Sequence, residues 1–412
     1  MPNIVCYFQM HQPHRLRRYS VFDTSHAYFD DGLNATICKR VAERCYRPAL
    51  GVLGRLIDRH AGRFGFALAI TGTLIDQLEA HAPDVLVTIR ELAATGRCEL
   101  IAETDPHALS ALGPIELFHE HVETHLARLR AHFGFEARVF RNTELIYSNA
   151  LARELSAWRT PDGSPRFVAC LAEGVGRVLA GRTPNAVYRA PESDGGVRLL
   201  LRNHRLSDDV AFRFGDRTWA HWPLGAETYA GWLDALDAGS GEPRVCNLFM
   251  DFETFGEHHQ RESGILDFLE TFPARLLERA ERHRFVTPSE AVGLGPDGGV
   301  YDCPSWTSWA DTSRDLGAWQ GNAMQVAALS RLHELGLRVR ERLMQQATPA
   351  LRDIGADWRR LASSDHVYYA ATANRADGAV HSYFSPYDSP YDAYINMMNV
   401  LDDLEERFST TI

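Results

Sequence analysis

The sequence predicts an α/β fold in which seven or eight parallel strands form a closed or nearly closed barrel, followed by a group of helices. Short apolar runs of strand length alternate with amphipathic helical stretches over the first 300 residues, and strand-like runs become rare after residue 310. Such alternation favours a parallel sheet covered by helices. We therefore expect a barrel over residues 1–300 and a helical subdomain over 301–412 that completes the cleft at the barrel mouth.

Seven apolar runs have the length and the β-branched or aromatic content of buried strands. These runs cover residues 3–8, 64–70, 98–102, 137–140, 167–169, 186–188 and 244–250. Between them, residues 83–95 and 115–133 have the apolar spacing of helices, the second directly after Pro114. In the C-terminal region, long helices are predicted for residues 316–346 and 349–364, and another at the end of the chain.

Composition narrows the class of protein. The chain has 412 residues, 45% of them hydrophobic and 24% charged, which is typical of a soluble globular protein with a sizeable core. A formal net charge of −11 argues against nucleic acid as a partner, so a neutral substrate fits better. No run approaches the roughly 20 apolar residues that span a membrane. The seven cysteines are scattered without a C-x-x-C pair, and the N-terminal segment lacks the features of a signal peptide, so we expect a cytoplasmic protein.

Polar residues follow four of the predicted strands at the point where each strand ends. They are His11, Glu103 with His107, Glu144, and Asp251. Any one of them is as easily explained as a helix cap or a hydrogen-bonded buried histidine. Four independent segments are harder to explain in that way, because the carboxyl ends of barrel strands meet on the face that carries the active site.

The pair Glu144 and Asp251 has the chemistry of a glycosidase. On facing strand ends, one carboxylate could attack an anomeric carbon while the other, kept protonated, protonates the leaving oxygen. Aromatic residues that could stack on sugar rings are plentiful, although most aromatic side chains belong to cores. They include Trp219, Trp222, Trp232, Trp306, Trp309, Trp319, Tyr383, Phe384 and Tyr387.

A metal-dependent hydrolase is the alternative that the same residues allow. The nitrogen and oxygen ligands of a divalent cation are available at His11, His14, Asp251, Glu253, His258 and His259. Against it, there is no H-E-x-x-H motif, and neighbouring histidines cannot both point into one site from a regular helix. Glu253 could instead hinder the ionisation of Asp251, or simply make a structural hydrogen bond.

Five segments, in order along the chain, resemble the motifs of glycoside hydrolase family 57, in particular its α-amylase-like branch. They are HQPHR (11–15), GRCELIAETDPHALS (96–110), FRNTELIYSN (140–149), MDFETFGEH (250–258) and TSWADTSRDLGAWQGNAMQ (307–325). The later stretches LASSDHVYYA (361–370) and DGAVHSYFSPYDSPYDAYINMMNVL (377–401) are also similar to that branch.

This resemblance implies an incomplete (β/α)7 barrel followed by a helical bundle. It also implies retaining hydrolysis of α-1,4-glucans or maltooligosaccharides, with no required metal or other cofactor. By matching of motifs, Glu144 would be the nucleophile and Asp251 the general acid/base. His11 would hydrogen-bond the sugar at the cleaved position. The residues that would line the cleft or orient the acids are His107, Trp309, Asp311 and Arg314, with Glu253 beside Asp251.

One departure from the family pattern concerns the second motif, where Asp105 and Pro106 replace an aromatic pair. Loss of aromatic surface there predicts altered subsites for sugar. The chain is short for a 4-α-glucanotransferase or a branching enzyme, which favours an α-amylase-type hydrolase. The alternatives that stay open are those two transfer activities, a metal-dependent deacetylase-like hydrolase, and a catalytically weak glucan-binding homologue.

Overall fold

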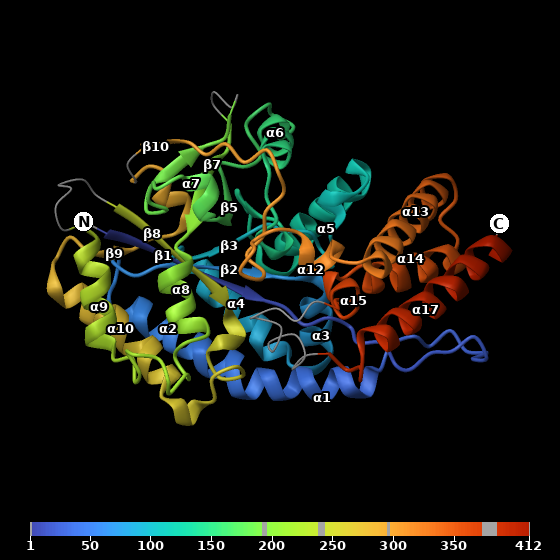
Figure 1. Cartoon of the computed structure of the whole chain (residues 1–412), viewed down its shortest axis with the longest axis horizontal. Coiled ribbons are helices and arrows are strands. Elements are labelled where there is room, and N and C mark those ends of the chain that lie inside the picture. The colour runs from blue at the N-terminus through green and yellow to red at the C-terminus, as the bar shows by residue number, and fades with distance from the viewer. Residues whose placement is uncertain (1, 192–195, 238–243, 295–296, 373–384, 412) are drawn as a thin grey trace.

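A computed structural model describes residues 2–191, 196–237, 244–294, 297–372 and 385–411 (Figure 1). Tyr383 and Phe384, which we considered as sugar platforms, lie outside these residues, as does the 377–384 part of the last motif. Seven parallel strands form the barrel. They are β1 (Pro2–Met10), β2 (Phe66–Ile70), β3 (Cys98–Leu100), β4 (Val139–Arg141), β5 (Ala169–Glu173), β7 (Arg198–Arg202) and β8 (Arg244–Asp251).

The strands pair in the order β8, β1, β2, β3 on one side and β4, β5, β7 on the other. Two narrow contacts join these halves: the parallel bridge between Ala102 and Phe140, and the pairing of Arg202 with Asn247. The second contact is narrow because β6 (Val187–Arg189) pairs with the first residues of β7. The predicted incomplete (β/α)7 barrel is thereby confirmed.

One strand prediction was wrong in its role. The run 186–188 does form a strand, β6, but it runs antiparallel to β7 and pairs on its other side with β10 (Asp297–Val300), outside the ring. Its place in the barrel is taken by β7, with the sequence RLLLR, which we did not predict. A further short strand, β9 (Arg284–Phe285), pairs with the start of β1.

Helices cover the outside of the barrel (Figure 1). Two of those predicted are confirmed: α4 begins at Pro83 and α5 follows Pro114, where the fixed φ of proline suits a helix start. The helices of the barrel region are α1 (Asp31–Val41), α2 (Arg47–Arg59), α3 (Gly72–His81), α4 (Pro83–Ala94), α5 (Ile115–Phe133), α6 (Asn149–Ala157), α7 (Gly176–Leu179), α8 (His204–Ala211), α9 (Ala226–Asp234), α10 (Ile265–Arg279) and α11 (Pro288–Ala291).

The C-terminal region is helical, as predicted, but with more breaks. Residues 316–346 form two helices because Asn322 caps the second, its side chain accepting a hydrogen bond from the backbone N–H of Gln325. Figure 1 shows α13, α14 and α17 packed together on the side away from the N-terminus. The helices are α12 (Gly317–Gln320), α13 (Ala323–Gln345), α14 (Pro349–Leu361), α15 (Ser364–Tyr368) and α17 (Pro390–Thr411). A division at residue 300 stays a prediction.

Strand alternation decides what lies inside the barrel. Along β8, Val245 and Phe249 belong to the apolar cluster that fills the interior, whereas Cys246, Leu248 and Met250 pack in the outer core with the helices. The same period of two places Asp251 on the inner face. No helix in the part of the chain that the structure describes is long and apolar enough to cross a membrane.

Candidate active site

A layer of polar side chains lies on top of the apolar interior, one from each barrel strand. Each member stands two residues after a member of the interior cluster, so both point to the same face of the strand. We call these seven residues the polar layer: Gln9, Thr71, Glu103, Arg141, Glu173, Arg202 and Asp251. Three of them, Gln9, Arg202 and Asp251, line a cavity of about 520 Å³ at the carboxyl ends of the strands.

All eight predicted site residues line this cavity, although they come from five separate segments of the chain. They are His11, His107, Glu144, Asp251, Glu253, Trp309, Asp311 and Arg314. Helices α12 and α15 of the C-terminal region contribute Trp319, Ser364, Asp365 and Tyr368 to the lining. The barrel mouth and the C-terminal helices therefore share one cavity.

The backbone at several of these positions is strained. Six non-glycine residues of the described chain have positive φ, and four of them are His107, Glu144, Asp311 and Arg314. At Glu144, φ is 56° and ψ is 28°, inside a single turn that follows β4. Left-handed backbone is unfavourable for such residues and gathers at functional sites, where the surroundings impose it. This strain sets the direction in which the Glu144 side chain enters the cavity.

Glu144 is held by two donors. Nε2 of His107 lies 2.9 Å from Oε1, and Nε1 of Trp309 donates to Oε2 at 2.6 Å. Burial opposes ionisation, but the hydrogen bond and charge of His107 outweigh it, helped by Arg141 and Trp309, and lower the pKa of Glu144 to about 2. The Glu144 side chain is 20% exposed, so a ligand in the cavity can reach this ionised carboxylate.

Asp251 has the opposite preference. Burial, and next the negative charge of Glu144, raise the pKa of Asp251 to about 6, although Arg141 and other cations oppose the shift. Glu144 is thus the acid whose charge raises the pKa of Asp251 most. For Glu253 we had considered that effect or a structural hydrogen bond. The cavity therefore holds one carboxyl group that favours the ionised form and one that favours the protonated form.

Glu253 is buried and hydrogen-bonded. The Tyr46 hydroxyl donates to Oε1 at 2.5 Å, and the backbone N–H of His11 donates to the same atom at 3.3 Å. Burial and the charge of Asp251 raise the pKa of Glu253 to about 8. Tyr46 lies directly before α2, and His11 directly follows β1. These contacts therefore connect Glu253, which follows β8, to the start of α2 and the end of β1.

Cations of the polar layer support Trp309. The guanidinium carbon of Arg141 lies 5.1 Å from the indole centroid, and that of Arg202 lies 5.5 Å from it. Arg314 donates to the Trp309 carbonyl oxygen at 3.3 Å and lies 3.3 Å from Glu173. The indole is therefore fixed in place while its N–H holds Glu144.

Several site residues escaped prediction. Arg202 pairs with Asp208 at 2.6 Å and with Glu173 at 3.4 Å, and Asp365 lies 2.8 Å from His11. The alternation of each strand carried the signal for the polar layer, since its members follow interior residues at a spacing of two. Asp365 lies in LASSDHVYYA, one of the stretches that resemble the family, but no role was attached to it.

The unusual second motif has a structural explanation. Asp105 is buried, with Oδ1 2.8 Å from Nε of Arg128 on α5 and Oδ2 3.7 Å from Arg359 on α14. Neither Asp105 nor Pro106 is among the described residues that line the cavity. An altered sugar subsite at this position stays a prediction. Asp105 instead ties the barrel to the C-terminal helices.

The candidate metal ligands do not gather. In the described ranges, no group of three or more His, Cys, Asp or Glu side chains is arranged to hold a metal ion. His14 packs edge-on against Phe29, and His259 lies with Nε2 3.0 Å from the Ala211 carbonyl oxygen. His258 lines the cavity, as expected for a residue near its rim.

Comparison with known proteins agrees with the geometry. The model of glycosyl hydrolase family 57 matches residues 5–304. A protein of Methanocaldococcus jannaschii that is provisionally named an alpha-amylase is 38% identical over 405 residues, which cover 97% of this chain and 83% of that protein.

Two solved structures share the fold. A family 57 branching enzyme from Thermococcus kodakaraensis, in complex with glucose, is 14% identical with a TM-score of 0.67, covering 100% of this chain and 95% of its own. The 4-alpha-glucanotransferase of Thermococcus litoralis is 16% identical with a TM-score of 0.63, and the match covers 89% of this chain. This chain spans 55% of the glucanotransferase. The match to the family model and the identity with the relative show that the chain belongs to glycosyl hydrolase family 57 and is a glycoside hydrolase.

Proposed function

We propose that the protein is a retaining α-amylase-type hydrolase of α-1,4-glucans, with Glu144 as nucleophile and Asp251 as general acid/base. The observation that carries this proposal is that one cavity holds both acids in opposite surroundings: two donors hold the Glu144 carboxylate, whereas burial and the charge of Glu144 raise the pKa of Asp251. A nucleophile must be ionised, and an acid must hold its proton until the leaving oxygen needs it. The alpha-amylase name of the relative from Methanocaldococcus jannaschii supports the substrate class.

The reaction would run in two displacements. Glu144 attacks the anomeric carbon, the bond to the leaving glucose unit breaks, and Asp251 gives its proton to the leaving oxygen. Asp251, now a carboxylate, then takes a proton from water, the water oxygen bonds to the anomeric carbon, and Glu144 leaves. Both steps invert, so the α configuration is retained. No cofactor takes part in either step.

The other predicted residues receive supporting roles in this proposal. His107 and Trp309 orient Glu144 and keep it ionised, because both donate to its carboxylate. Arg314 holds the loop that carries Trp309. His11, Asp311 and Glu253 line the cavity where a sugar would bind. We also propose that residues 301–412 act as a subdomain that completes this cleft, because its helices contribute to the lining.

Transfer of the glucosyl group to another sugar is the second candidate, since hydrolysis and transfer share the intermediate. The names of the branching enzyme and the glucanotransferase support it. The match spans 55% of the glucanotransferase but 95% of the branching enzyme. That chain length favours hydrolysis stays a prediction. Only the product pattern can decide between water and a sugar hydroxyl as acceptor.

The test is a time course of the purified protein on maltoheptaose and amylose, with anomeric configuration followed by NMR. We expect shorter products that are first released in the α configuration. Glu144→Gln and Asp251→Asn should each lower the rate by roughly 10³-fold or more. Treatment with a chelator should leave the rate unchanged; loss of activity would favour the metal-dependent alternative. Longer products would establish transfer, and β products would refute retention.

A further inference from the structure

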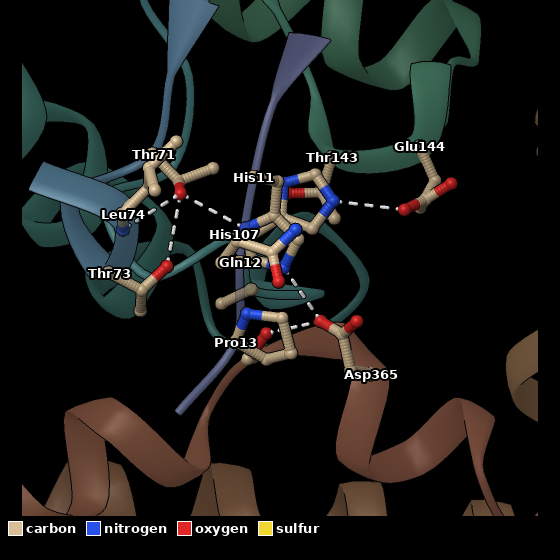
Figure 2. A network of polar contacts seen from close by, with 12 residues as sticks. His11, Gln12, Pro13, Thr71, Thr73, Leu74, His107, Thr143, Glu144 and Asp365 are labelled. Atoms are coloured by element: carbon tan, nitrogen blue, oxygen red, sulfur yellow. Dashed lines mark hydrogen bonds and ion pairs between the residues drawn. The ribbon is translucent and has the colours of Figure 1, made fainter. Parts of the chain in front are cut away.

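Asp365 is a carboxylate at the cavity that the mechanism proposed above does not use. It lies on α15, in the C-terminal region, and reaches across to the end of β1 (Figure 2). Its Oδ2 lies 2.8 Å from Nε2 of His11 and accepts a hydrogen bond from the Ser363 hydroxyl at 2.6 Å. Burial opposes its ionisation, but the hydrogen bonds from His11 and Ser363 and the charge of His107 outweigh it and lower the pKa of Asp365.

The contacts of His11 fix its tautomer. Burial, and next the charge of His107, lower the pKa of His11, so its ring is neutral at pH 7. An ionised carboxylate can only accept, so the proton of the ring lies on Nε2 and is donated to Asp365. Nδ1, 3.0 Å from Oγ1 of Thr71, must then accept from the Thr71 hydroxyl. Both ring nitrogens of His11 are thus engaged by the protein.

The Thr71 hydroxyl is itself oriented for this bond. Its oxygen accepts from the backbone N–H of Leu74 at 3.2 Å and lies 3.0 Å from the hydroxyl of Thr73. Thr71 caps α3, so the start of a barrel helix holds one edge of the His11 ring. Asp365, from the C-terminal helices, holds the opposite edge. Figure 2 shows the ring held between these two partners.

The His11 ring stacks on His107. The ring centroids are 4.1 Å apart and the planes are 23° from parallel. His107 donates from Nε2 to Glu144 and from Nδ1 to Glu103, as an imidazolium does. A neutral ring that donates to a carboxylate is electron-rich and suits the face of a cation, whereas a protonated His11 would repel it. The stack therefore depends on the neutral Nε2–H form of His11, which the hydrogen bond to Asp365 favours.

We propose that Asp365 is a positioning residue for the nucleophile: it holds His11 flat against His107, which in turn fixes Glu144. This inference rests on the proposed role of Glu144. It assigns the C-terminal helices a part in the chemistry beyond lining the cavity. It also differs from the sugar contact implied for His11 by the family resemblance, which would require His11 to release a protein partner.

The test uses Asp365→Asn, which keeps the size of the side chain and removes its charge. Activity is measured on maltoheptaose and on an aryl maltotrioside with a good leaving group, which needs no proton from Asp251. We expect kcat of Asp365→Asn to fall about tenfold to 100-fold on both substrates, with KM nearly unchanged, because misplacement of the nucleophile slows both. Asp251→Asn, in contrast, should recover on the aryl substrate.

Two further variants guard against misfolding. Asp357→Asn is the matched control, because Asp357 lies on α14 outside the cavity and pairs with Arg407; it should keep wild-type kinetics on both substrates. Ser363→Ala removes one hydrogen bond to Asp365 but keeps its charge, and should lower kcat in the same direction to a smaller extent. Wild-type kcat in Asp365→Asn, or a change in KM alone, would overturn the proposal.

An NMR measurement separates this inference from the proposed function. In protein labelled with ¹⁵N at histidine, His11 should appear as the neutral Nε2–H tautomer and His107 as an imidazolium, assigned by His11→Gln and His107→Gln. Asp365→Asn should weaken the Nε2–H preference of His11. If the wild type cleaves neither substrate, the proposed function fails. A protonated or Nδ1–H His11 in the wild type would overturn the role of Asp365 whatever the activity.

Discussion

Nε2 of His107 lies 2.9 Å from Oε1 of Glu144, and the opposite edge of the same ring lies 3.1 Å from Oε2 of Glu103. Burial opposes a positive charge on His107, but the hydrogen bonds to these two carboxylates outweigh it and raise the pKa of His107 to about 9. One buried cation thus stands between two acids. It keeps Glu144 ionised, whereas burial and the charge of Glu144 raise the pKa of Asp251.

Replacing His107 by Gln should uncouple the hydrogen bond from the charge. The amide can still donate to Glu144, but the cation that lowers the pKa of Glu144 is lost. We expect kcat/KM on maltoheptaose to fall about 100-fold. The acid limb of its pH profile should move to higher pH, because Glu144 now takes up its proton more readily.

The matched control is His119→Gln. His119 is half-buried on α5 and pairs with Glu154, away from the cavity. This variant should keep the wild-type profile. An acid limb in His107→Gln at the wild-type position would show that His107 does not control the ionisation of Glu144.

Asp251 should set the basic limb of the wild-type profile. Because its pKa is raised to about 6, kcat/KM should fall as pH rises through that value and the acid loses its proton. In Glu144→Gln, the charge that raises the pKa of Asp251 most is gone. We therefore expect Asp251 to titrate at lower pH in this variant.

The titration can be followed by ¹³C NMR of protein labelled at the aspartate carboxyl carbon, with the signal assigned by its loss in Asp251→Asn. Asp162, which is exposed and bound by Thr160, provides an internal reference that should not move between variants. An Asp251 signal that titrates at the same or higher pH in Glu144→Gln would contradict the coupling of the two acids.

The sequence predicted which strand ends meet at the cavity, but it did not predict every polar side chain at those ends. Glu144 and Asp251 were found because an acid after an apolar strand is conspicuous. Arg202 was not, since it ends RLLLR, a run that we did not recognise as a strand. The contribution of the 186–188 run to the ring was overestimated because length and composition do not reveal the direction of a strand.

Contacts between distant segments were beyond the reach of local patterns. Asp365 meets His11 across 354 positions of the chain. Asp105 meets Arg359 where two helices approach the barrel. Spacing within a strand or a helix says nothing about such pairs. The polar layer is different. Once the strands are known, the alternation of side chains along each strand predicts that its members point into the barrel.

The buried pair of Asp105 and Arg128 should matter for stability. Replacing Arg128 by Met leaves the buried Asp105 carboxylate with only Arg359, 3.7 Å away, as a partner. We expect a loss of about 3 kcal/mol in the free energy of unfolding at pH 7. The loss should shrink at lower pH. Burial already raises the pKa of Asp105, and removing Arg128 raises it further, so protonation relieves the unpaired charge.

Urea denaturation at pH 4.5 and pH 7 measures this difference. Arg130→Met is the control, because Arg130 lies on the same helix, is exposed and pairs with exposed Glu136. Its effect should be within about 0.5 kcal/mol of zero. An equal loss at both pH values for Arg128→Met would argue against an unpaired Asp105 as the cause.

Glu253 should make the folded protein less stable as pH rises. Its pKa is raised from 4.5 to about 8 in the folded state, so between these values the folded chain keeps a proton that the unfolded chain has lost. Below pH 4.5 both states are protonated and the group contributes no pH dependence. Above it, the free energy of unfolding falls by up to roughly 1.4 kcal/mol per pH unit, until the folded state ionises as well.

Glu253→Gln removes this effect while its amide oxygen can still accept from Tyr46 and from the backbone N–H of His11. The stability of the variant relative to wild type should therefore increase between pH 5 and pH 8.5 in urea denaturation. Tyr46→Phe should extend the loss to higher pH in the chain that keeps Glu253, because the Tyr46 hydrogen bond lowers the pKa of Glu253 and its removal raises that pKa further. Parallel pH dependence of wild type and Glu253→Gln would mean that Glu253 ionises normally. The raised pKa of this acid, and with it the influence of Asp251's charge at this end of the cavity, would then be wrong.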